Sequence, residues 1–88
     1  MNALLTEFMG TFFFLYVILS TSNFLAIGAA LALAVYLGGP ISGGNFNPAV
    51  TIMMITAKKQ KMDTLPYIIA QIAGGLSALA LYKKLHTI

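Results

Sequence analysis

The stretch GGNFNPAVT, residues 43 to 51, interrupts an otherwise apolar chain with glycines, asparagines and a proline. Asn47 suits the N-cap of a helix, and Pro48 suits its first turn, where a missing amide hydrogen costs little. We therefore expect a short helix over residues 47–57, about 16 Å long at ~1.5 Å per residue. This length is about half of a bilayer core, which is typical of a re-entrant segment.

Around this stretch, the composition is that of a membrane protein. The 88-residue chain is 59% hydrophobic and 8% charged, with a mean hydropathy of +0.89. A soluble domain this short has too much surface for such a composition. Apolar segments cover residues 3–20, 24–39 and 65–82, each roughly 24–27 Å long as a helix and close to the ~30 Å of a hydrocarbon core.

We therefore expect an all-α membrane protein of one domain, with three transmembrane helices plus one re-entrant half-helix. The re-entrant loop and half-helix are predicted over residues 40–57. Gly38, Gly39 and Pro40 predict the end of the second span, because this run disfavours a helix.

Charge and residue types restrict the function further. Five lysines against Glu7 and Asp63 give a net charge of +3, and the lysines cluster at 58–61 and 83–84, at the predicted membrane borders. That pattern favours the lipid bilayer as a partner and argues against nucleic acid. With no cysteine and one histidine, no metal or other cofactor is expected. We find no catalytic motif and predict that the chain is not an enzyme.

The Asn-Pro stretch predicts a water-accessible path. Irregular backbone is tolerated inside a membrane only where it lies in protein or lines a water-filled cavity. The half-helix N-terminus and the Asn47 amide would place partial positive charge and hydrogen-bond donors on that path, near the membrane midplane. Such a path favours dipolar solutes and opposes cations.

The segment ISGGNFNPAVT (residues 41–51) closely resembles the first-half loop of aquaporins and glycerol facilitators, the major intrinsic protein family. TEFMGTFFFLY (6–16), FLAIGAALALAVY (24–36) and YIIAQIAGG (67–75) are similar to the first, second and third helices of that family. The resemblance implies half of an aquaporin-like fold and a channel for water or small neutral solutes. It also implies pore residues Asn47, Pro48 and Ala49, with Ile27 and Val50 near the constrictions.

Members of the family normally contain two inverted repeats of this unit, and this sequence contains one. The resemblance therefore implies a pore built from at least two units, most simply an antiparallel homodimer with higher assembly possible. Val50 stands where an arginine often follows the second motif, and the chain has no arginine. A wider and more apolar path than that of a strict water channel is expected. The alternatives are an accessory, non-conducting subunit of another aquaporin-like chain and an inactive half-channel.

Two polar residues lie within the predicted spans. Glu7 could be a proton-relay carboxylate or lie close enough to the border to reach water, but the resemblance implies that it accepts hydrogen bonds from the re-entrant loop. Gln71 is expected to tie its helix to neighbouring backbone. Small residues predict close helix packing instead of a solute surface: Gly10, Gly28 with Ala32, and the series Ala70, Gly74 and Ala78.

Overall fold

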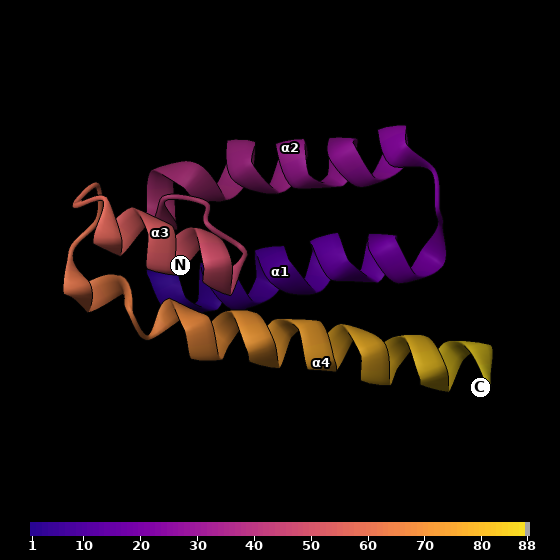
Figure 1. Ribbon diagram of the computed structural model, residues 1–88. Coiled ribbons are helices and arrows are strands. Elements are labelled where there is room, and N and C mark those ends of the chain that lie inside the picture. Colours follow the sequence, from indigo (N-terminus) through magenta and orange to yellow (C-terminus); the bar gives the residue numbers. More distant parts are fainter. Residues whose placement is uncertain (88) are drawn as a thin grey trace.

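The computed structural model describes residues 1–87 (Figure 1), and this part of the chain is entirely helical apart from its turns and loops. Its elements are α1 (Ala3–Ser20), α2 (Phe24–Ser42), α3 (Pro48–Thr56), a 3-10 turn (Met62–Thr64) and α4 (Tyr67–His86). The expected all-α architecture of three long helices and one half-length helix is confirmed.

Three helical segments are long and apolar enough to cross a membrane: Ala3–Ser20, Phe24–Ser42 and Met62–His86. Their apolar side chains largely face outward, as the exposed Leu25, Tyr36 and Ile69 illustrate. The largest fully buried side chains include Glu7 and Gln71. This reverses the distribution found in soluble domains and suits a chain whose outer surface meets lipid.

The long helices lie side by side, with α1 between α2 and α4 (Figure 1). Asparagine N-caps start the first two: the Asn2 side chain accepts from Leu5 N at 2.7 Å, and that of Asn23 accepts from Ala26 N at 2.9 Å. A short turn between them makes α1 and α2 antiparallel neighbours. The half-helix α3 lies towards the end of the bundle that carries the N-terminus.

The second helix continues beyond the predicted end. We expected residues 38–40 to stop it at Gly39, but α2 runs through Pro40 to Ser42 and ends at Gly43, whose φ is 94°. Gly39 explains part of this difference, because a glycine has no Cβ to clash with the following proline ring. The first helix has the predicted bounds. The fourth differs by a few residues: α4 begins at Tyr67 and extends to His86, where lysines and a histidine suit a helix C-terminus.

Close packing between α1 and α4 depends on a glycine. A Cβ at Gly74 would lie 2.5 Å from the Phe8 carbonyl oxygen and 3.2 Å from the Phe12 amide nitrogen. One turn further along, Ala78 is completely buried, and one turn earlier Ala70 is half-buried. The predicted series of small residues on α4 therefore lies at or beside this helix contact.

On α2 the predicted packing residue lies away from the contacts among the described helices. Gly28 is exposed, and a Cβ there would meet nothing within 4 Å among the described residues. The buried positions of α2 are instead Ala30, Ala34, Gly38 and Ser42. These positions repeat every four residues, as Gly28 and Ala32 do. They lie on another face of the helix, because Ala30 follows Gly28 by two residues and its side chain points roughly 200° further around the helix axis.

Candidate functional site

The loop between α2 and α3 folds into the bundle through left-handed backbone conformations. Gly43 and Gly44 have φ values of 94° and 69°, which glycine adopts without a steric penalty. Phe46 has a φ of 53° although it carries a large side chain. Such a conformation is uncommon outside glycine and persists where surrounding contacts hold it.

The Phe46 ring is the contact that fixes this loop. It is 2% exposed, and it lies where a Cβ on Gly10 or Gly38 would overlap it. A Cβ at Gly38 would be 2.7 Å from the ring Cζ atom. The two glycines, one on α1 and one on α2, thus leave the space that the ring fills. Gly10, expected to pack against a helix, packs against this loop side chain.

Glu7, completely buried on α1, accepts four hydrogen bonds. Its Oε2 accepts from Ser42 Oγ at 2.6 Å and from the Asn45 backbone nitrogen at 3.1 Å. Its Oε1 accepts from the Phe46 backbone nitrogen and from Gln71 Nε2, both at 2.8 Å. A carboxylate is the side chain that can only accept, and it satisfies donors from α2, the loop and α4 together. These partners favour a loop-holding role over a proton relay, because none of them exchanges protons readily near neutral pH.

Gln71 links α4 to α1 and α3. Its Nε2 donates to Glu7 Oε1 and to Thr51 Oγ1, each at 2.8 Å. These acceptors are side chains, so the expectation of a backbone partner is wrong. The fully buried Thr51 on α3 and Tyr67, whose hydroxyl donates to the Ser42 carbonyl at 2.8 Å, were not foreseen. Tyr67 lies one helical turn before the predicted Gln71, and that spacing is a signal that could have indicated Tyr67.

Asn47 caps the half-helix and keeps its donor group available. Its Oδ1 accepts from Ala49 N at 2.8 Å, while the residue itself is exposed. Within residues 1–87, its Nδ2 donates no hydrogen bond. Pro48 occupies the first helical position and Ala49 is exposed beside it. The predicted motif therefore forms the tip of α3, with an unused amide donor at that tip.

A groove of about 410 Å³ lies at this tip. Phe46, Asn47 and Pro48 form part of its wall. The rest comes from the middle of α1 and of α4: Thr11, Phe14, Leu15, Gln71, Ile72, Gly75 and Leu76. The groove combines apolar walls with a few polar groups, as solute-binding surfaces commonly do.

Two buried polar atoms on this groove lack a partner in the described part of the chain. They are Thr11 Oγ1 and Gln71 Oε1, in residues that are 2% and 1% exposed. Buried polar atoms are nearly always hydrogen-bonded, and an unmade bond is costly. Both atoms lie below the surface of the groove, so a molecule in the groove does not reach them in this arrangement.

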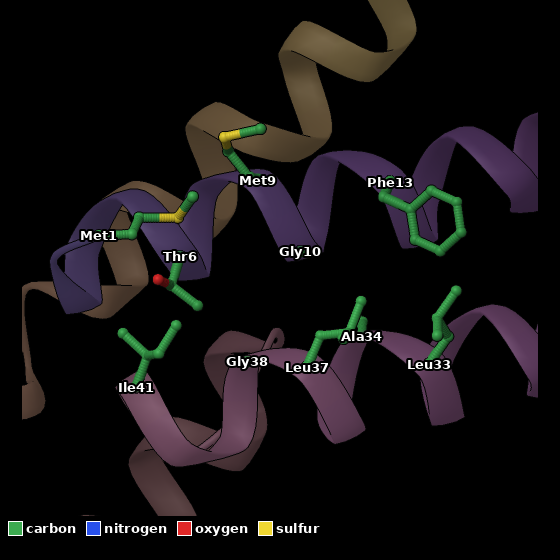
Figure 2. A pocket seen from close by; sticks show the side chains of 10 residues that line it. All are labelled: Met1, Thr6, Met9, Gly10, Phe13, Leu33, Ala34, Leu37, Gly38 and Ile41. Carbon is green, nitrogen blue, oxygen red and sulfur yellow. The ribbon is translucent and has the colours of Figure 1, made fainter.

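A second groove, of about 360 Å³, lies between α1 and α2 (Figure 2). Figure 2 shows Phe13 on α1 facing Leu33 on α2, with Thr6 as the one polar side chain in the wall. This surface offers little to a polar solute. Ile27 and Val50, the predicted constriction residues, are half-buried and line neither groove.

Three membrane-length helices and a half-length helix that starts from a buried polar loop define an integral membrane protein with a re-entrant segment. The family model described as Major intrinsic protein matches residues 19–87. The chain belongs to this family.

Curated relatives of the chain include proteins named as uptake facilitators and as aquaporins. The chain is 43% identical to glycerol uptake facilitator protein-like 6 of Lactiplantibacillus plantarum, over 96% of this chain and 44% of that protein. It is 51% identical to the propanediol uptake facilitator PduF of Salmonella typhimurium, over 68% of this chain and 25% of that protein. It is 44% identical to aquaporin Z of Photorhabdus laumondii, over 64% of this chain and 25% of that protein. The chain thus spans less than half of each relative's length. No solved structure matches it.

Proposed function

We propose that the chain is a unit of a passive membrane channel for water and small neutral solutes. The observation that carries the proposal is the Asn47 amide, which is held by its own cap at the tip of a half-helix and faces a groove beside the middle of α1 and α4. A helix N-terminus there presents partial positive charge, which attracts dipolar oxygens and repels cations. The names of the relatives, which include glycerol, propanediol and water facilitators, are in keeping with this class of solute.

The pore in this proposal needs a second unit. One chain leaves the Asn47 groove open on one side. A second unit of the same kind, in antiparallel orientation, would cover the groove. The lysines are balanced enough for both orientations, because three lie at 58–61 and two at 83–84.

Within this channel, Glu7 and Gln71 support the loop, and Ile27 and Val50 narrow the path. The support role rests on the hydrogen bonds that the two side chains share with the loop and α3. The constriction role rests on the resemblance and on the position of Val50, three residues after the cap of α3. Because both candidate constriction residues are apolar, the proposed path discriminates weakly among small neutral solutes.

Replacing Asn47 with aspartate tests the proposal. The aspartate keeps an oxygen to cap α3, but it exchanges the amide donor for a negative charge. In liposomes that contain only this chain, we expect N47D to lower osmotic water permeability by at least about twofold, the effect of one lost hydrogen bond of ~0.5–1.5 kcal/mol. Stopped-flow light scattering after an osmotic step measures this change.

Asn23→Asp is the matched control, because Asn23 caps α2 through the same kind of side-chain bond and lines neither groove. It should leave permeability close to that of the wild type. If vesicles with folded, inserted wild-type protein shrink no faster than empty ones, the self-sufficient channel is wrong. Neutral-solute uptake would then be measured with and without a second aquaporin-like chain. Uptake that depends on both chains would indicate an accessory subunit, and no effect of this chain would indicate an inactive half-channel.

A further inference from the structure

The loop after α3, residues 57–61, turns back towards the loop that precedes α3. Lys58 adopts a left-handed conformation with a φ of 61°, and the backbone nitrogens of Lys59 and Gln60 donate to the Met54 carbonyl at 2.9 and 3.2 Å. This turn directs the Gln60 side chain to Gly43, where a Cβ would lie 2.9 Å from Gln60 Nε2. Two loops separated by the whole of α3 are therefore in contact.

The contact is a reciprocal pair of side-chain amides. Asn45 Nδ2 donates to Gln60 Oε1 at 2.8 Å, and Gln60 Nε2 donates to Asn45 Oδ1 at 2.9 Å. Asn45 Nδ2 also donates to Thr51 Oγ1, at 3.0 Å. Asn45 is 5% exposed, so an amide without these partners would be a buried and unsatisfied group.

We propose that the Asn45–Gln60 amide pair is a latch that holds the loop before Asn47 in the geometry required for conduction, with Gln60 as a positioning residue. Gln60 holds Asn45, which belongs to the loop before Asn47. The backbone nitrogens of Asn45 and of the next residue, Phe46, donate to Glu7, and Asn47 follows Phe46. The latch joins both ends of the half-helix, since one loop leads into α3 and the other leads out. The role in conduction rests on the proposed channel function, whereas the latch itself does not.

Gln60→Glu tests the latch through pH. A glutamate carboxylate accepts from Asn45 Nδ2 but cannot donate to Oδ1, whereas the protonated acid can do both, as the amide does. At pH 7 we expect Q60E to lower water permeability at least about twofold and to speed hydrogen exchange at the Asn45 and Phe46 amides by roughly tenfold. As the pH falls below ~4.3, the ordinary pKa of glutamate, both effects should diminish.

Every value is compared with the wild type at the same pH, because other ionisable groups lie near this pair. These are Glu7 on α1 and Tyr67 on α4, Asp63 in the 3-10 turn, and, on the same loop as Gln60, Lys58, Lys59 and Lys61. Lys59→Gln, an exposed change beside Gln60, should match the wild type throughout. Gln60→Ala should show the effects at every pH, since alanine has no group that acid can restore.

The two proposals fail in different ways. If wild-type vesicles conduct while exchange and permeability in Q60E and Q60A equal those of the wild type, the latch is overturned and the channel stands. If wild-type vesicles do not conduct, the channel proposal fails and exchange alone decides the latch: unchanged exchange overturns it, and acid-reversible acceleration in Q60E supports it. The latch would also be overturned if the faster exchange in Q60E did not reverse in acid while exchange in Q60A equalled that of the wild type.

Discussion

Replacing Glu7 with alanine is expected to lower the free energy of unfolding by about 4 kcal/mol, because four buried donors lose their acceptor and each unmade bond costs ~1–3 kcal/mol before water enters the space. The donors come from α2, the re-entrant loop and α4. Their loss therefore releases the loop from both helices together. Reversible unfolding in mixed detergent micelles measures the change.

Glu7→Gln separates shape from hydrogen bonding in the same experiment. The amide has the shape of the carboxylate, but its NH₂ group would face two of the donors, so we expect a loss of about 2 kcal/mol. Leu4→Ala, an exposed change on the same helix, should stay within about 0.5 kcal/mol of the wild type. An E7A variant as stable as L4A would mean that the carboxylate does not hold the loop.

Gly74→Ala is expected to destabilise the protein by about 2–3 kcal/mol, because the added methyl group has no space. Its Cβ would lie 2.5 Å from the Phe8 carbonyl oxygen and 3.2 Å from the Phe12 nitrogen. These atoms belong to the backbone of α1 and cannot rotate away, so α1 and α4 must separate. The same unfolding experiment measures this loss.

Two other glycine-to-alanine changes calibrate the effect. At Gly75 the nearest atom is Leu15 Cδ1 at 2.7 Å, the end of a flexible side chain, so the loss should be smaller than at Gly74. At Gly28 the space is open, and alanine should leave stability unchanged or raise it by up to ~1 kcal/mol, since it favours a helix more than glycine does. Any order other than Gly74, then Gly75, then Gly28 would contradict the described α1–α4 contact.

Parts of the fold were predictable because they depend on local properties. The three long helices follow from apolar runs of membrane length, and the start of α3 follows from an asparagine cap and the proline after it. The error in the predicted end of α2 also has a local cause. A proline usually ends a helix, but here it lies near the C-terminus and follows a glycine, where its cost is reduced.

The candidate site was only partly predictable. Glu7 and Asn47 stand out as polar groups in apolar surroundings, and both lie at the loop or its support. Thr51, Tyr67 and Gln60 do not stand out by residue type, because each type is common at helix faces or in turns. Their roles in the site come from partners that lie 15 to 25 positions away in the chain.

Local features of the sequence were enough to predict a membrane protein with three spanning helices and a capped half-helix, because hydrophobicity, length and capping act over a few turns. Helix packing, in contrast, sets the contact of Glu7 with Gln71 across 64 positions and the burial of Ala30 and Ala34, instead of Gly28, on α2. Neighbouring residues on a helix point ~100° apart, so small rotations decide which side chains meet. Those rotations are set by how the helices pack, and here Phe46 and the glycines facing it help to fix that packing.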